Sequence, residues 1–373
     1  MMKRFRVLIA AVLLLFLTAP AAAAEEDALQ QVQDDTAQAL GALMNDDVSD
    51  TLHAFGLDLS DPQTVFDVST ENITAFFTQS LASTLRDVGT RFLPFVSLLL
   101  LIALVRVLIR DTSAAQGMRL LCVSAVAIFS VAQMEPLIST LLSAMRVATD
   151  FMHGYVPVYT GLLALSGAPT GAAVYSGVVF SLAQGVSAFC DGGCVTMVGC
   201  FFALLIANAF SQRMNLSRFV GGVNRALSIV MGLLASVFAA VLGVRSALSG
   251  SLDAVSVKST RFLISSLIPV VGGSISDAYA AVLGSLQLIK GSVAVVGILV
   301  LLVLLVPPIL ETLLVYFLFL LAATAAELLD CADLAALIRG FGVGVRFLLL
   351  AAVLQLFAVL IATGIMLSLK GGG

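Results

Sequence analysis

The sequence is poor in the residues on which soluble enzymes depend. It contains no tryptophan and two histidines, and 11% of its 373 residues are charged. Soluble domains carry roughly 25% charged residues, so a single large soluble core is excluded. The histidines, His53 and His153, lie a hundred residues apart, and no set of four nitrogen or sulfur ligands is assembled for a structural zinc ion.

Sequence motifs for nucleotide binding are absent as well. There is no Walker loop, no Gly-x-Ser-x-Gly elbow and no dinucleotide-binding fingerprint between a strand and a helix. Close packing of a helix explains the alternating glycines Gly340, Gly342 and Gly344 better than phosphate binding does. We therefore expect a protein that is not an enzyme, with no cofactor, no metal and no nucleic-acid partner.

Long apolar runs dominate the chain. Hydrophobic residues make up 60% of the sequence, and the mean hydropathy is +1.08. An α-helix needs about 20 apolar residues to cross a bilayer, and this composition predicts an all-α, polytopic helical membrane protein with eight or nine spans. The expected spans lie near residues 92–109, 118–134, 172–189, 194–210, 226–248, 292–310, 313–326 and 343–368, with a proline-containing stretch at 151–166 as the ninth.

The N-terminus has the pattern of a secretory signal. Three basic residues, Lys3, Arg4 and Arg6, precede an apolar stretch at 7–17, and small residues follow just before residue 25. This order predicts a signal peptide over residues 1–24 that is cleaved on the extracytoplasmic side. The alternative is an uncleaved first span.

Charge is distributed unevenly along the rest of the chain. Residues 25–90 contain thirteen acidic residues and one basic residue, a formal charge of −12, whereas residues 91–373 contain ten acidic and fifteen basic residues, a formal charge of +5. We expect residues 25–90 to form an acidic, helical extracytoplasmic leader and residues 91–370 to form the transmembrane domain. The leader is either a docking surface for a partner or a solvated segment on the membrane.

Two basic loops bear on the topology. Basic residues in cytoplasmic loops set the orientation of membrane proteins. Both loops are cytoplasmic together only if the stretch at 151–166 crosses the membrane, which gives nine spans. The basic residues are Arg106, Arg110 and Arg119 in the first loop and Arg213, Arg218 and Arg225 in the second.

One charged segment interrupts the apolar domain. Residues 255–290 contain basic and acidic side chains around a Pro-Val-Val-Gly-Gly break. Irregular backbone at membrane depth is tolerated where it packs in protein or lines a wet cavity, which favours a re-entrant functional element; the alternative is an interfacial helix with solvated charges. The candidate pathway residues are Lys258, Arg261, Pro269, Gly272, Gly273, Asp277 and Lys290.

Two weaker features accompany this segment. Pro157 and Gly161 form a second break that resembles the first at a distance of 112 residues, and such paired breaks can mark a central site; chance similarity is the alternative. Cys190 and Cys194 flank an Asp-Gly-Gly sequence that predicts a tight turn between two spans. These cysteines are either joined by a disulfide or are two unpaired apolar residues.

Several stretches together resemble the stage III sporulation protein AE family. The resemblance covers most of residues 60–370, and its most specific part is the fixed spacing of Lys, Arg, Pro, Gly and Asp around the break. The similar stretches are Val257–Phe262, Ile268–Gly272, Asp277–Ala278, Leu286–Lys290 and Pro157–Ala164.

The resemblance implies a role in endospore formation. Members of this family lie in the mother-cell membrane around the forespore, within the complex of stage III sporulation A proteins. That complex includes a cytoplasmic ATPase and ring-forming membrane proteins, and it joins stage II sporulation protein Q across the intermembrane space. The implied function is a core or gating component of a channel that supports forespore development. The alternatives are a secondary transporter for a small solute and a passive scaffold for ring proteins.

Overall fold

The computed structural model describes residues 28–57, 64–65, 70–109, 115–166, 172–173, 177, 180–210, 218, 220–236, 239–240 and 272–368. All regular secondary structure in these residues is helical, which confirms the predicted all-α class. The predicted signal peptide, residues 1–24, lies outside the described residues.

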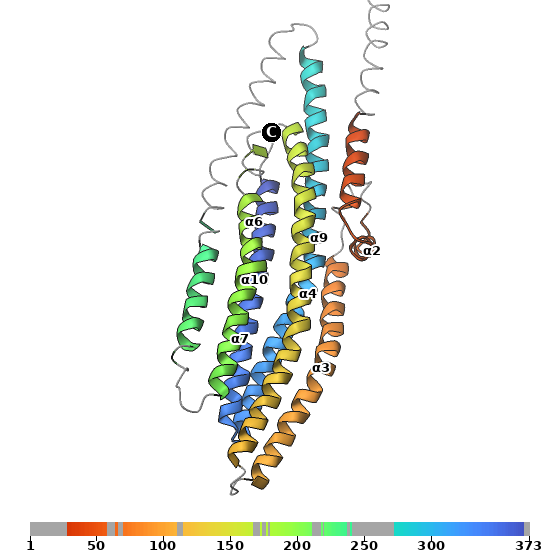
Figure 1. Cartoon of the computed structure of the whole chain (residues 1–373). Coiled ribbons are helices and arrows are strands. Elements are labelled where there is room, and N and C mark those ends of the chain that lie inside the picture. Colours follow the sequence, from red (N-terminus) through yellow and green to blue (C-terminus); the bar gives the residue numbers. More distant parts are fainter. Residues whose placement is uncertain are drawn as a thin grey trace, which may run out of the picture.

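Long helices run up and down a single bundle (Figure 1). In the view of Figure 1 the chain descends along α3, rises along α4, descends through α6, η2 and α7, and finally descends along α9 and rises along α10. Two further helices lie at residues 28–41 and Val220–Ser236. The bounds are α2 Asp46–Ala54, α3 Thr70–Ile109, α4 Ala115–Leu165, α6 Phe180–Ala188, η2 Phe189–Cys194, α7 Val195–Phe210, α9 Gly272–Leu328 and α10 Ala332–Ser368.

Among the described residues, five helices are long and apolar enough to cross a membrane. Three pairs of expected spans each form one continuous helix, and the expected span at 226–248 is described only in part, mainly in the shorter helix Val220–Ser236. The pair 118–134 and 151–166 lies in α4, the pair 172–189 and 194–210 shares one helix over its described part, and the pair 292–310 and 313–326 lies in α9. The five helical stretches are Glu71–Arg106, Gly117–Leu165, Gly192–Phe210, Val282–Leu328 and Ala332–Leu360.

Prolines lie inside these helices without ending them. A hydroxyl three or four residues after each of four prolines donates a hydrogen bond to that proline's carbonyl oxygen, a contact that tends to bend a helix. In apolar helices such hydroxyls and neighbouring helices compensate for the hydrogen bond that proline removes. The pairs are Ser97 to Pro94 at 2.8 Å, Ser139 to Pro136 at 2.9 Å, Thr160 to Pro157 at 3.0 Å and Thr312 to Pro308 at 2.7 Å.

The four longest helices, α3, α4, α9 and α10, all exceed the thickness of a bilayer, α4 and α9 by the most. α4 has 51 residues and α9 has 57, so at 1.5 Å per residue they are about 77 and about 86 Å long. The hydrocarbon core is only about 30 Å thick. Each of these two helices is therefore either strongly tilted in the membrane or extends well beyond the hydrocarbon core.

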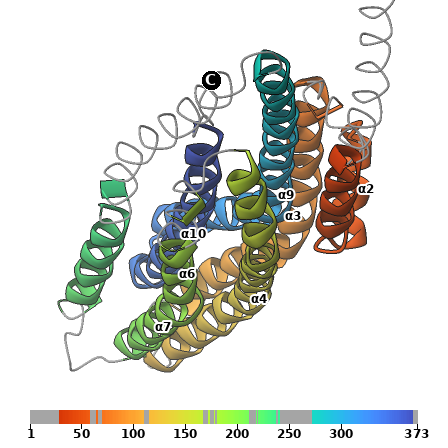
Figure 2. The same cartoon turned by 90° about the horizontal axis from the view of Figure 1, so that it is seen from above.

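Helix α9 is the central helix of the bundle. It packs against α3, α4 and α10 along its length, and the view from above shows it among these helices (Figure 2). Its residues Val300, Leu301 and Leu305 are at most 1% exposed. A helix that is apolar on all sides is expected at a core position, which explains why α9 contains two apolar runs in succession.

Glycines bring α10 close to α7. A methyl group placed on Gly344 would overlap the ring of Phe202, and one placed on Gly340 would overlap the side chain of Leu205. Small residues four positions apart allow two helices to approach closely. The close-packing interpretation of these two glycines is therefore confirmed.

The described part of the acidic leader packs on the bundle. Leu40, in the helix of residues 28–41, is 2% exposed and lies with Thr36 against Ile289 and Val293 of α9. Leu43 occupies the space left by Gly154 of α4. The leader is therefore held by apolar contacts, and its acidic side chains are left on the outside.

Candidate functional site

An ion-pair cluster joins three helices at the lower end of the bundle. Asp333, in the first turn of α10, accepts two hydrogen bonds from Arg106 of α3 at 2.9 and 2.8 Å and one from Arg119 of α4 at 3.0 Å. The side chains of Arg106 and Asp333 are each about one quarter exposed. A carboxylate is also favoured at a helix N-terminus. The arginines predicted to mark a cytoplasmic hairpin thus hold that hairpin to α10.

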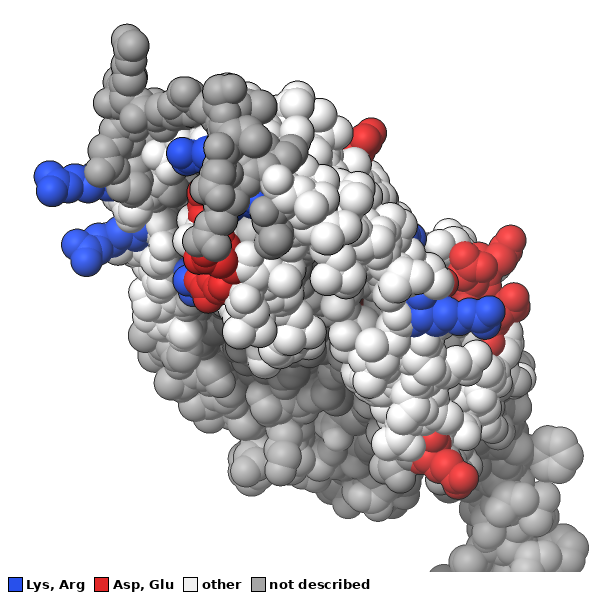
Figure 3. Space-filling model, turned by 90° about the horizontal axis from the view of Figure 1, so that it is seen from below, with Lys and Arg blue, Asp and Glu red and all other residues white. Residues whose placement is uncertain are grey.

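Helix α7 ends at this same end of the bundle, where α3 also ends (Figure 1). The nine-span count required the two basic loops to lie on one side, and residues 211–217 of the second loop lie outside the described residues. Seen from below, charged side chains of both signs lie mainly in two groups on opposite sides of the view, with uncharged residues between them (Figure 3).

A second ion pair lies within the apolar region of two helices. Arg91 of α3 donates to Glu311 of α9 at 2.8 Å, and their side chains are 48% and 14% exposed. Fifteen residues separate Arg91 from Arg106, which is about 22 Å along a helix. Glu311 follows Pro307 and Pro308, and the structure places it inside the continuous helix α9.

A buried polar node joins α4, α6 and α10. Gln355 of α10 is 2% exposed, and its amide nitrogen donates to the Met145 carbonyl at 3.1 Å and to the hydroxyls of Thr149 and Ser187 at 3.3 Å each. Those two hydroxyls are 2.5 Å apart. The Gln355 carbonyl oxygen is buried without a partner among the described residues. Such a group is costly in an apolar interior, which makes this node a candidate functional site.

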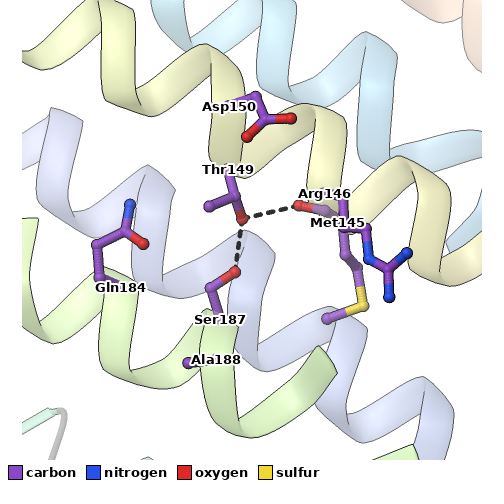
Figure 4. A pocket seen from close by; sticks show the side chains of 7 residues that line it. All are labelled: Met145, Arg146, Thr149, Asp150, Gln184, Ser187 and Ala188. Carbon is purple, nitrogen blue, oxygen red and sulfur yellow. Dashed lines mark hydrogen bonds between the residues drawn. The ribbon is translucent and has the colours of Figure 1, made fainter. Parts of the chain in front are cut away.

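A cleft of about 270 Å³ lies beside the node. Figure 4 shows Thr149 of α4 and Ser187 of α6 pointing toward each other across it. His153 extends the polar surface, because its Nδ1 lies 2.9 Å from the Thr149 carbonyl and 3.4 Å from the Gln184 amide. The lining residues are Met145, Arg146, Thr149, Asp150, Gln184, Ser187 and Ala188.

The lining chemistry suits polar solutes or water. The cleft presents two hydroxyls and an amide together with the exposed guanidinium of Arg146 and the exposed carboxylate of Asp150. Polar and ionisable groups in membrane bundles are expensive and usually face a wet cavity or a pathway. Among the described residues, no three potential ligands gather in a way that could hold a metal ion.

The segment predicted to be functional lies largely outside the described residues. Lys258, Arg261 and Pro269 are outside them, and Gly272, Gly273 and Asp277 belong to the first turns of α9 with side chains that are not described. Lys290 lies inside α9 and is 5% exposed. The described part of the proposed re-entrant element, residues 272–290, is regular helix.

The second predicted break does not interrupt its helix. Pro157 and Gly161 lie on an exposed face of α4, which continues through both. The opposite face carries Tyr155 and Tyr159, both fully buried, and the Tyr155 hydroxyl donates to the Val293 carbonyl of α9 at 3.4 Å. Tyr155 therefore contributes to the contact between α4 and α9, whereas Pro157 and Gly161 face outward.

The cysteine turn is also replaced by helix. Residues 189–194 form the π-helix η2, which runs directly into α7, because one widened turn accommodates the Asp-Gly-Gly sequence within the helix. Cys194 is a free, buried cysteine whose thiol lies 3.9 Å from the Phe347 carbonyl. The structure therefore has no disulfide at Cys194, and the side chain of Cys190 is not described.

The sequence reasoning did not find the polar node. Arg146 and Asp150, one helical turn apart in an apolar stretch, were the available signal. Thr149, Ser187 and Gln355 are ordinary polar residues until the three helices that carry them meet. Only the packing of α4, α6 and α10 reveals them as a group.

We expect Gln355→Leu to destabilise the protein. The change removes the donor to the Met145 carbonyl and to both hydroxyls, and leaving a buried acceptor unsatisfied costs about 1–3 kcal/mol. The measurement is the unfolding free energy of the purified protein in detergent. Because Thr149 bonds directly to Gln355, Gln355→Leu and Thr149→Val should be non-additive in a double-mutant cycle. Strict additivity would show that the node is not a connected unit.

Two comparisons identify relatives of this chain. The model of the family described as stage III sporulation protein AE matches residues 64–369. The stage III sporulation protein AE of Bacillus subtilis (strain 168) is 23% identical over 187 residues, which is 49% of this chain and 46% of that protein. This chain thus spans about half the length of the curated relative that it matches. No solved structure matches it.

Proposed function

Because this chain belongs to the stage III sporulation protein AE family, we propose that it is a core or gating component of a mother cell-to-forespore channel complex. It is a sporulation membrane protein by family and by its five long apolar helices. In this proposal it lies in the mother-cell membrane around the forespore and supports forespore development. Its partners are other stage III sporulation A proteins, among them a cytoplasmic ATPase and ring-forming membrane proteins, and indirectly stage II sporulation protein Q.

The polar cleft between α4 and α6 is the observation that carries the proposal. A bundle that served only as a membrane anchor would gain nothing from a buried amide and two hydroxyls beside a guanidinium and a carboxylate. Burial of the Gln355 amide and the Ser187 hydroxyl is costly unless their polar atoms are hydrogen-bonded or contact water or a polar solute. Transport or gating is the simplest use of the cleft, and catalysis by this chain is not part of the proposal.

Two other functions make different predictions. A solute transporter would use the same cleft without partners, because its volume of about 270 Å³ suits a small molecule. A passive scaffold would need the leader, which is anchored by Leu43 in the space beside Gly154, and would not need the cleft. A channel component would need both.

We expect Ala188→Phe to abolish the function. Ala188 is exposed at the wall of the cleft, so a benzyl group there fills the cleft without entering the core. The measurement is the yield of heat-resistant spores and of a forespore reporter in the native host, with the protein level followed in membranes. The matched control is Ser181→Phe, an exposed position on the same helix that does not line the cleft.

Two further tests separate the alternatives. Normal sporulation with Ala188→Phe and failure after removal of residues 28–57 would favour the scaffold. Solute movement by the purified chain alone in proteoliposomes, blocked by Ala188→Phe, would favour the transporter. The channel proposal requires that both changes abolish sporulation and that the isolated chain moves no solute.

A further inference from the structure

Helix α2 packs against α9, and the residue that follows it, Phe55, contacts the upper part of α3. The rings of Phe55 and Phe76 meet edge to face with centroids 5.7 Å apart, and the Asn72 amide donates to the Phe55 carbonyl at 3.3 Å. Val48 and Leu52, on the inner face of α2, are 3% and 2% exposed. Phe55, directly after α2, therefore ties the end of α2 to α3, while α2 itself packs against α9.

A groove of about 480 Å³ runs between α2 and α3. Its wall on α3 extends from Asn72 to Ser83, which is about 17 Å or three helical turns. The lining on α3 is uncharged and includes the small residues Ala75, Ser80 and Ser83, and the lining on α2 contains a carboxylate, Asp50. Small lining residues leave room for the backbone of a partner helix.

The charge around the groove has one predominant sign. Asp46 and Asp47 are exposed. They lie one helical turn before the groove-lining residues Asp50 and Thr51, so they share the groove side of α2. Asp87 lies one turn beyond Ser83 on α3, beside Arg86, the single basic residue of residues 25–90. Four carboxylates against one guanidinium would repel an acidic partner and attract a basic one.

We propose that the groove between α2 and α3 binds a basic, amphipathic helical segment of a partner protein. The segment lays a three-turn face along Asn72 to Ser83 and directs lysine or arginine side chains toward Asp46, Asp47 and Asp50. The groove is separate from the polar cleft, so this interaction does not depend on the transport role.

The test uses the full chain in nanodiscs of zwitterionic lipid. The probes are an amphipathic peptide of lysine, leucine and alanine, about 18 residues or five turns long, and its counterpart with glutamate in place of lysine. We expect the lysine peptide to bind and the glutamate peptide not to bind. Empty nanodiscs measure the contribution of the bilayer.

Two pairs of variants locate the binding. The double variant Asp46→Asn, Asp50→Asn should lower the affinity for the lysine peptide about fivefold. The double variant Asp34→Asn, Asp35→Asn removes the same charge away from the groove and should leave the affinity unchanged. Ala75→Trp fills the groove and should weaken binding at least about tenfold, while Thr78→Trp, on another face of α3, should not.

Three results would overturn the proposal. Equal affinity for the lysine and glutamate peptides would show that charge does not determine binding. Unchanged affinity in Ala75→Trp would place the peptide outside the groove. Equal binding to empty nanodiscs would assign it to the lipid surface.

Discussion

Replacing Gly344 by leucine is expected to separate α10 from α7 and to give the largest loss of stability among single changes. A methyl group at this position already overlaps the ring of Phe202, whose centroid lies 4.9 Å from that of Phe341. Phe341 is fully buried, so the ring cannot move away without displacing the core. Overpacking of this kind costs about 1–3 kcal/mol or more. The measurement is the unfolding free energy and the yield of monodisperse protein in detergent.

The matched control is Gly89→Leu on α3. No neighbouring atom lies within 4 Å of a Cβ atom placed on Gly89, and leucine favours helix more than glycine does by about 0.5–1 kcal/mol. This control is expected to be neutral or slightly stabilising. A second check is compensation, because Phe202→Ala should recover part of the stability lost in Gly344→Ala. Absence of any recovery would mean that the contact between α7 and α10 is not the cause.

Replacing Asp333 by asparagine is expected to give the second large effect. The change leaves Arg106 and Arg119 without the carboxylate that both contact. Removing one partner of a fully buried ion pair costs about 3–5 kcal/mol, and a fully exposed pair contributes about 0–1 kcal/mol. Because Asp333 and Arg106 are about one quarter exposed, we expect a loss of about 2–3 kcal/mol.

Glu327→Gln is the matched control for this change. Glu327 and Arg339 form an ion pair with side chains 46% and 50% exposed, so its loss should cost at most about 1 kcal/mol and should vanish at high salt. The Asp333 effect should persist at high salt. A double-mutant cycle with Arg106→Gln measures the coupling directly. Equal losses for Asp333→Asn and Glu327→Gln would show that the three-helix cluster has no special role.

Proline was the main source of error in the predicted span boundaries. The sequence around Pro157 and around Pro307 and Pro308 indicated breaks, yet α4 and α9 continue through these positions. In a packed apolar bundle there is no water to stabilise an open helix end, so the backbone keeps its helical bonds. The Asp-Gly-Gly sequence at 191–193 failed as a turn signal for the same reason.

The candidate site was only partly within reach of sequence reasoning. Lys290 was recognised as a charge in an apolar stretch, and the structure places it within the central helix α9. The node around Gln355 was missed because its hydrogen-bond partners are 168 and 206 residues away in the chain. A single polar residue in an apolar span gives no indication of which helix it will meet.

The sequence by itself determined the class of this protein. The preference of an apolar segment for helix and lipid depends on its own residues, so composition and run length were enough to predict an all-α membrane protein with an acidic leader. Tertiary structure decided how many helices the apolar runs form and which glycines pack against a side chain of another helix. It also decided which polar groups lie around Gln355. Those outcomes depend on contacts between residues far apart in the chain, and the free energy of such contacts cannot be read from one segment alone.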